Sequence, residues 1–107
     1  MSHIIVSMTT ATREEAEKIT RNLLAQKWIA CANIVGPVSS LFWWKNKINQ
    51  DNEFLVLMKT RSSLFEKLAA AIKQMHSYEV PEIIAVPITK GEQSYMDWLR
   101  SSLRKGE

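Results

Sequence analysis

The sequence predicts an α+β fold, in which a four-stranded antiparallel sheet is covered on one face by helices and a further helix follows at the C-terminus. Three observations carry this prediction. Apolar β-branched runs alternate with amphipathic stretches, the helical stretches begin at capping signals, and 107 residues suit one domain. We therefore expect residues 1–107 to form a single domain with one modest core.

The first strand and helix are indicated by a β-branched run and a capping box. Residues 3–9 are rich in isoleucine and valine and predict a strand. Thr12 and Glu15 have the spacing at which each side chain accepts a hydrogen bond from the other's amide. The helix is predicted to run from there to about Lys27. Its apolar residues at three-and-four spacing are Ala16, Ile19 and Leu23.

A long hairpin is predicted next. Residues 30–44 have strand character, with a bend or bulge at Gly36-Pro37. Residues 54–58 form a third, almost purely apolar strand. The chain reverses between these strands either at residues 45–47 or at residues 49–52.

The second half of the chain repeats the pattern. Ser63 and Glu66 predict a capping box and a second helix, with an inward stripe of Phe65, Leu68, Ala69, Ile72 and Met75. Residues 82–88 form a fourth strand, in which Pro87 indicates an edge position or a bulge. Residues 94–103 form the last helix, with Tyr95, Trp98, Leu99 and Leu103 expected to point inward. The order βαββαβ predicts a ferredoxin-like sandwich.

The apolar pattern also predicts self-association. The third strand does not alternate between polar and apolar residues, the fourth barely does, and residues 41–44 are four large apolar side chains in a row. Consecutive strand residues face opposite sides, so both faces of the sheet need covering. Either the hairpin folds over its own sheet, or another copy covers it. We expect the second, a homo-oligomer with sheet-to-sheet contact, because a small domain has little spare chain.

Composition limits the partners. The net charge is +3, but the 14 basic and 11 acidic residues are interleaved, which argues against nucleic-acid binding. No apolar run is long enough for a membrane span, and no signal peptide is visible. The single cysteine, Cys31, allows no internal disulfide and favours a reducing compartment. We expect a cytoplasmic protein.

No catalytic motif is visible, so we expect no enzyme activity, and the chemistry-bearing residues are candidate metal ligands. Cys31 is either a buried strand thiol or a soft ligand. His76 either complements a helix dipole or, with Glu79, binds a metal. His3 either begins a strand or, with the amino terminus, binds Cu²⁺ in a square plane.

Five stretches in order resemble the CutA divalent-cation-tolerance proteins over about residues 4–103. They are residues 30–34, residues 40–44 with 47–48, residues 59–61, residues 78–83 and residues 95–99. The resemblance implies a cytoplasmic homotrimer, with sheets packed around a three-fold axis, that takes part in copper and divalent-metal tolerance. Three positions depart from the family pattern: Phe42 replaces tyrosine, Asn46 replaces glycine and Ser77 replaces proline.

Two functions follow from these features. The first is a homotrimer that binds copper (Cu²⁺), or other divalent cations, through Cys31, His76, Glu79 and His3. The second is a small-ligand-sensing or scaffold trimer similar in architecture to PII signal proteins. Its clefts between subunits would be lined by Lys59, Tyr78, Glu82 and Trp44.

Overall fold

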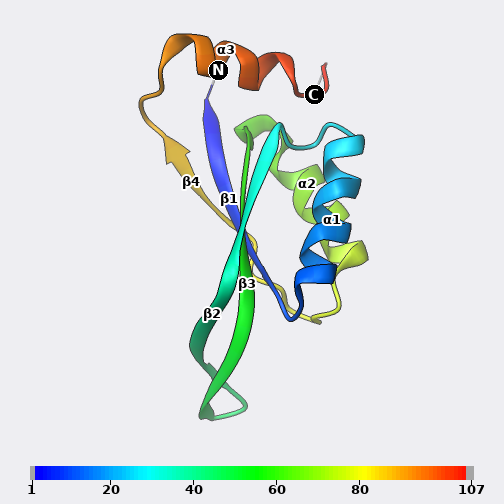
Figure 1. The fold of residues 1–107 in the computed structure, drawn as a ribbon, viewed down its shortest axis with the longest axis vertical. Coiled ribbons are helices and arrows are strands. Elements are labelled where there is room, and N and C mark those ends of the chain that lie inside the picture. The colour runs from blue at the N-terminus through cyan, green and yellow to red at the C-terminus, as the bar shows by residue number, and fades with distance from the viewer. Residues whose placement is uncertain (1, 106–107) are drawn as a thin grey trace.

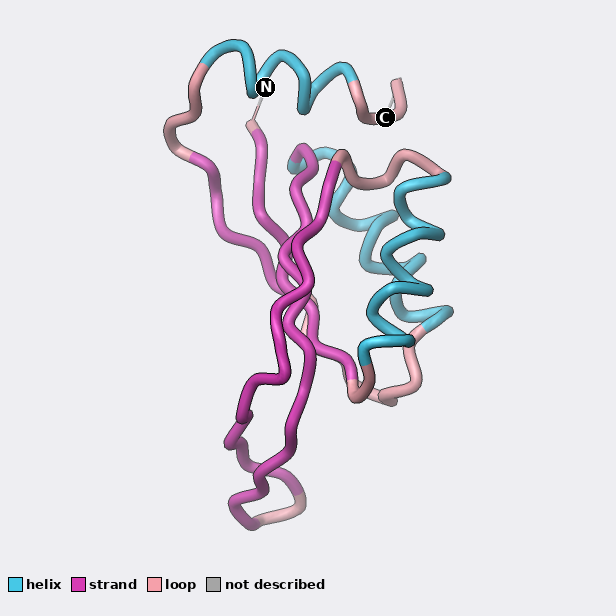
Figure 2. Tube along the Cα trace, viewed as in Figure 1, coloured by secondary structure: helices cyan, strands magenta, loops and turns pink. Residues whose placement is uncertain are grey.

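A computed structural model describes residues 2–105. Its elements, in chain order, are β1 (His3–Thr10), α1 (Arg13–Ala25), β2 (Cys31–Trp44), β3 (Lys47–Arg61), the short 3-10 helix η1 (Ser62–Leu64), α2 (Phe65–Met75), β4 (Ile84–Ile88) and α3 (Gln93–Ser101). Figure 2 shows the helices and strands along the chain.

The four strands form one sheet in the order β2-β3-β1-β4, and every neighbouring pair is antiparallel. Helices α1 and α2 cover one face of this sheet, whereas α3 crosses one end of it (Figure 1). This arrangement confirms the predicted α+β fold with its four-stranded antiparallel sheet. Among residues 2–105 no helix lies along the opposite face, although Tyr95 of α3 contacts Cys31 and Lys59 at its end.

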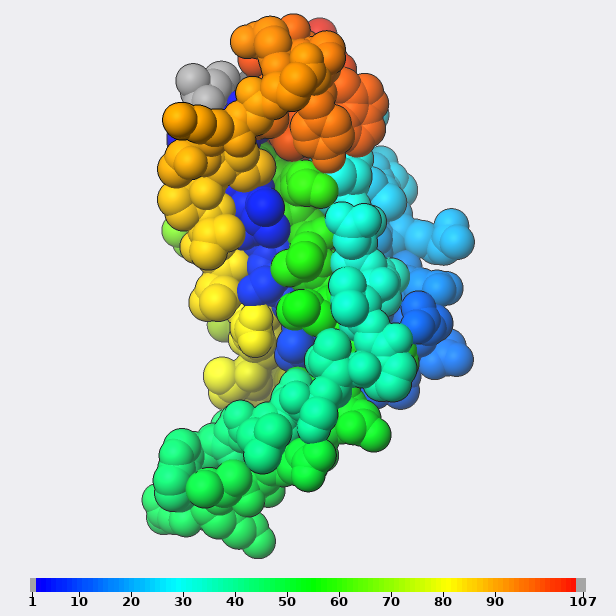
Figure 3. Space-filling view, turned by 60° about the vertical axis from the view of Figure 1, so that its left-hand side comes forward, coloured from blue at the N-terminus to red at the C-terminus, as the bar shows by residue number. Residues whose placement is uncertain are grey.

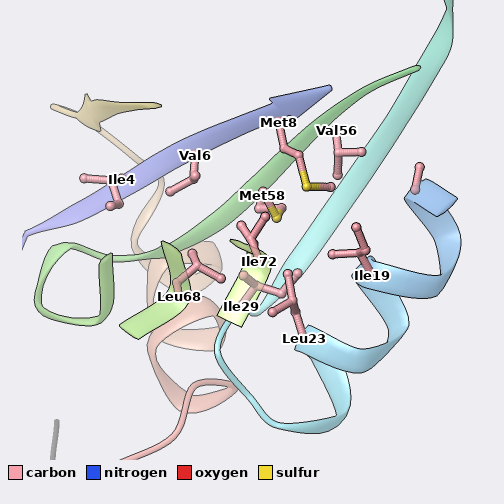
Figure 4. Packing of buried hydrophobic residues seen from close by; sticks show 11 residues of the cluster. Ile4, Val6, Met8, Ile19, Leu23, Ile29, Val56, Met58, Leu68 and Ile72 are labelled. Atoms are coloured by element: carbon pink, nitrogen blue, oxygen red, sulfur yellow. The ribbon is translucent and has the colours of Figure 1, made fainter. Parts of the chain in front are cut away.

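The core lies between the sheet and the two helices (Figure 4). Paired residues in an antiparallel sheet share a face, and Val6 lies opposite Met58 while Met8 lies opposite Val56. All four side chains are fully buried. The helical residues packed against them include Ile19, Leu23, Leu68 and Ile72. The predicted inward stripes of both helices are confirmed at these buried positions.

Helix α1 begins as the capping signal predicts, but only half of the capping box forms. The Thr12 hydroxyl accepts from the Glu15 amide at 3.1 Å. The Glu15 carboxylate does not reach back. It accepts instead from the backbone amide of Ser77 at 2.7 Å and from its hydroxyl at 3.0 Å. Glu15 therefore ties α1 to the chain that leaves α2.

The capping box predicted for α2 is wrong. Ser62–Leu64 form a 3-10 turn, and Leu64 is the residue that precedes the helix, with no side-chain cap. The Ser63 hydroxyl accepts from the Arg61 side chain at 3.0 Å. The 3-10 turn moves the start of the helix past Ser63, so Ser63 does not stand at the capping position.

The β2–β3 hairpin is longer than predicted, because β3 begins at Lys47 and not at residue 54. Lys45 and Asn46 form the turn with φ of 51° and 66°, so the reversal falls at the first of the two predicted places. The register shifts between Val35 and Val38, at the predicted bulge. The hairpin extends well beyond the helices and makes the molecule 44 Å long (Figure 1).

The last strand and helix are confirmed, with one correction. β4 lies at a sheet edge, where Pro87 is tolerated. Leu99 in α3 and Leu103, just beyond the end of this helix, are buried as predicted. Tyr95 and Trp98 were expected to point inward, but both are exposed. The reason is that α3 packs over the end of the sheet, where one narrow apolar stripe suffices.

Candidate functional site on the open face of the sheet

The face of the sheet opposite α1 and α2 is open and largely apolar. Figure 3 shows β4, β1, β3 and β2 side by side on it. Val35, Ile84 and Val86 expose about half of their surface, at 45%, 58% and 53%. Ile5 and Leu57 share this face and are half-buried. A solvated antiparallel face is normally polar at such positions, so this surface suits a binding role.

A groove of about 740 Å³ opens where the hairpin leaves the sheet. One wall comes from the hairpin and the other from the segment that joins α2 to β4. The lining residues are Thr9, Ser40, Leu41, Phe42, Trp44, Asn49, Asp51, Glu53, Tyr78, Glu79, Val80, Pro81 and Glu82. Strand register explains the first wall, because Ser40 lies opposite Asp51, and Phe42 opposite Asn49.

Tyr78 and Glu53 join the two walls. The Tyr78 hydroxyl donates to Glu53 Oε2 at 2.6 Å. Glu53 is only 6% exposed. Burial raises the pKa of the Tyr78 hydroxyl well above its ordinary value, and the hydrogen bond and charge of Glu53 raise this pKa further, as do the charges of Asp51 and Glu15. The phenol therefore stays protonated and donates throughout the physiological pH range.

His76 holds this segment in place. Its Nε2 donates to the Thr9 carbonyl at 2.7 Å, and its Nδ1 accepts from the Tyr78 amide at 3.0 Å. The two partners define a neutral imidazole protonated on Nε2. Glu15 Oε2 lies 3.7 Å from Nδ1. Both ring nitrogens are already hydrogen-bonded, so a metal would have to displace one of these bonds to use His76.

His3 lies at the other end of β1, opposite Arg61 on β3 and Ile88 on β4. It is buried, and its Nε2 has no hydrogen-bond partner among residues 2–105. Burial lowers the pKa of His3, and the positive charges of Arg100, the amino terminus and Arg61 lower it further. His3 is therefore a buried, neutral residue of β1.

We expect acid to destabilise the protein through His3. In the unfolded chain its pKa is about 6.5, and in the folded chain it is lower, so the unfolded state binds more protons between the two values. Stability should fall as pH drops below about 6.5 and level off below the folded-state pKa. Urea denaturation between about pH 5 and pH 8 measures this. In His3→Asn, which keeps His76, the slope should be shallower, and equal slopes would refute the prediction.

The candidate metal ligands are not brought together within one chain. Cys31 is half-buried beside Lys59 on the open face, with its Sγ 3.6 Å from the Tyr95 hydroxyl. His3 and Thr9, the partner of His76, lie six positions apart on β1, or roughly 20 Å at the rise of a strand. Glu79 lines the groove. Within residues 2–105, no three His, Cys, Asp or Glu side chains are grouped so that they could hold a metal ion.

Three of the four residues predicted to line a cleft do lie together. Trp44, Tyr78 and Glu82 all line the groove. Lys59 does not, since it stands six positions along β3 from Glu53, again roughly 20 Å away. Its Nζ donates to Asn33 Oδ1 at 3.4 Å and lies 5.9 Å from the centre of the Tyr95 ring.

Sequence reasoning missed Asp51 and Glu53. Neither was assigned to a strand: Asp51 fell in the alternative turn at residues 49–52, and Glu53 fell just before the predicted third strand. Only the pairing of β3 with β2 places them in the groove wall. No alternation of polar and apolar residues marks Glu53, because residues 54–58 are all apolar.

These features define a class: small α+β proteins with a four-stranded antiparallel sheet, an open apolar face and a long projecting hairpin. More narrowly, the chain belongs to the CutA1 divalent ion tolerance family, whose model matches residues 4–102. It is 42% identical to the divalent-cation tolerance protein CutA of Archaeoglobus fulgidus, over 91% of this chain and 94% of that protein.

Solved structures agree with this assignment. CutA1 from Oryza sativa superposes with a TM-score of 0.96 at 37% identity, covering 99% of this chain and 97% of that one. The divalent cation tolerance protein from Thermus thermophilus superposes with a TM-score of 0.93 at 37% identity, covering 95% of this chain and 99% of that one. The chain spans 58% and 56% of the length of the chloroplastic CutA proteins of rice and Arabidopsis thaliana. No helix in residues 2–105 is long and apolar enough to cross a bilayer.

Proposed function

We propose that this protein acts in tolerance to divalent cations by binding copper (Cu²⁺), as a cytoplasmic homotrimer and without catalysing a reaction. The observation that carries the proposal is membership of the divalent ion tolerance family over residues 4–102. The lack of a second cysteine to pair with Cys31 supports a reducing compartment. The names of the rice and Arabidopsis relatives assign those two proteins to the chloroplast.

The open face supports assembly. Ile84 and Val86 on the sheet, and Leu41 and Trp43 on the hairpin, together leave a large apolar surface exposed on one chain. Contact between copies would remove this surface from water, which is the main favourable term in association.

Light scattering on metal-free protein should give the mass of three chains, and addition of Cu²⁺ should leave that mass unchanged. Assembly that requires copper would make the metal structural and overturn this expectation. A monomer under both conditions would overturn the trimer itself.

The copper site is proposed to lie between copies. Copper prefers thiolate and imidazole ligands, and Cys31 is the chain's one thiol. Its side chain is half-buried on the open face, and among residues 2–105 no group of three His, Cys, Asp or Glu side chains could hold a metal ion within one chain. Ligands from neighbouring copies would complete the coordination.

We expect Cys31→Ser to weaken Cu²⁺ binding by roughly tenfold or more, because a hydroxyl is a poor substitute for a thiolate. Calorimetric titration of the metal-free protein measures the affinity. Ser39→Ala, on the same strand and exposed, is the matched control and should bind as the parent protein does. An unchanged affinity in Cys31→Ser would remove Cys31 from the copper site.

A second candidate function is favoured by the groove. Its volume of about 740 Å³ falls in the range of small-molecule sites, and it contains Trp44, Tyr78 and Glu82. In a trimer this groove would lie in or beside a cleft between subunits and could serve a ligand-sensing or scaffold role. A ligand that binds the folded state would raise the melting temperature of the metal-free protein.

A further inference from the structure

We infer that the groove binds an organic cation, an ammonium or guanidinium group carried on an apolar body. The inference rests on the second candidate function, the binding of a small molecule in this groove, and it names the chemical class of that molecule.

The charge of the groove is one-sided. Four carboxylates line it, from Asp51, Glu53, Glu79 and Glu82, and no lysine, arginine or histidine of residues 2–105 does. The chain as a whole has more basic than acidic residues, so this distribution is not a consequence of composition. Lys47, opposite Trp44 near the hairpin turn, lies outside the lining.

Glu53 is the strongest single indication. It is 6% exposed and lines the groove, yet the one hydrogen-bond partner of its carboxylate in residues 2–105 is the neutral Tyr78 hydroxyl, at 2.6 Å. No cationic side chain of the described residues pairs with it. A buried carboxylate without a counter-charge is costly, and a cation in the groove would offset that cost.

The same carboxylates act on the other wall of the groove. Burial raises the pKa of the Tyr78 hydroxyl, and the hydrogen bond and charge of Glu53 and the charge of Asp51 raise this pKa further, so negative charge is disfavoured at that wall. Glu82 is exposed and accepts from the Ser7 hydroxyl at 2.7 Å through Oε2, a neutral partner, so its negative charge remains available to a ligand. A positively charged ligand therefore meets favourable electrostatics on both walls.

Aromatic rings decide between an organic cation and a bare metal ion. Phe42 and Trp44 alternate with other residues on the hairpin wall, and Tyr78 stands on the other wall. Aromatic faces attract cations that are weakly hydrated, such as ammonium and guanidinium groups on carbon frames. A bare ion would need several convergent ligands, and the carboxylates of residues 2–105 do not converge in that way.

Three isosteric probes test the inference: choline, neutral 3,3-dimethylbutan-1-ol and anionic 3,3-dimethylbutanoate. Each is titrated into the metal-free protein in its native assembly, and binding is followed by the NMR signal of the Trp44 indole N–H, assigned with Trp44→Phe. Choline should shift this signal and bind roughly tenfold or more tightly than the alcohol, and the anion should not bind. Added salt should weaken choline binding.

Substitutions locate the charge. Glu79→Gln and Glu82→Gln should each weaken choline binding several-fold, whereas Glu66→Gln, an exposed carboxylate on α2 outside the groove, should not. Similar binding of choline and the alcohol would keep the groove as a ligand site but overturn its cation selectivity. Equal losses in all three variants would also overturn it. No shift with any probe would overturn both the inference and the small-ligand function, while copper titration would still decide the metal function separately.

Discussion

Leu68→Ala is expected to lower the free energy of unfolding by about 2–5 kcal/mol, which is a large part of the stability of a small domain. Leu68 is fully buried on α2 and belongs to the cluster formed with Val6, Met58 and Ile72 (Figure 4). Truncation removes its apolar contacts and leaves a cavity that rigid strand neighbours cannot fill completely.

Leu24→Ala is the matched control. It is the same substitution of leucine by alanine, but Leu24 lies on α1 and is 38% exposed. Urea denaturation at one protein concentration compares the two variants, since the apparent stability of an oligomer depends on concentration. We expect a much smaller loss for Leu24→Ala. Equal losses would mean that the packing of α2 on the sheet is not what stabilises the fold.

Sequence periodicity was sufficient to predict the core because burial there follows local rules. Leu68 and Ile72 are four residues apart on a helix, and Val6 and Met8 are two apart on a strand, so each pair had to share a face. The same reasoning failed for Tyr95 and Trp98. Their spacing fits an inward stripe, but how much of a stripe is buried depends on what lies beneath α3, which is the narrow end of the sheet.

The capping signals show a second limit. Thr12 caps α1 as predicted, whereas Ser63 in the same kind of motif does not cap α2. Ser63 lies within a 3-10 turn, so the helix begins after it, and the Glu15 carboxylate accepts from Ser77 in place of the amide of Thr12. The bond from Ser77 to Glu15 is donated by the backbone amide of Ser77. The CutA family usually has proline at this position, and proline has no amide hydrogen to donate.

The candidate site was less predictable than the fold. Cys31, His76 and His3 have donor atoms suited to copper, but β3 lies between the strands of Cys31 and His3, and His76 contacts the other end of β1 from His3. Neither separation is visible in the spacing of the donors along the sequence. The groove depends on the register shift between Val35 and Val38, which sets which hairpin residues face Tyr78. A one-residue change of register would turn Glu53 and Asp51 to the other face.

His76→Ala is expected to lower the free energy of unfolding by about 2–4 kcal/mol, while leaving copper affinity unchanged. The substitution removes the acceptor for the Tyr78 amide and the donor to the Thr9 carbonyl, and both backbone groups then lose their partner beside a new cavity. Denaturation and copper titration on the same preparation separate the two effects.

Ser77→Ala is the control for His76→Ala, because it removes only the hydroxyl bond to Glu15 at an exposed position and keeps the amide bond. We expect its loss of stability to be well under half of that for His76→Ala. If His76→Ala instead kept its stability and lost copper affinity, the imidazole would be a metal ligand whose hydrogen bonds are expendable. A loss of stability alone would establish that this histidine fixes the wall of the groove, with Tyr78 held by its Nδ1 and the end of β1 held by its Nε2.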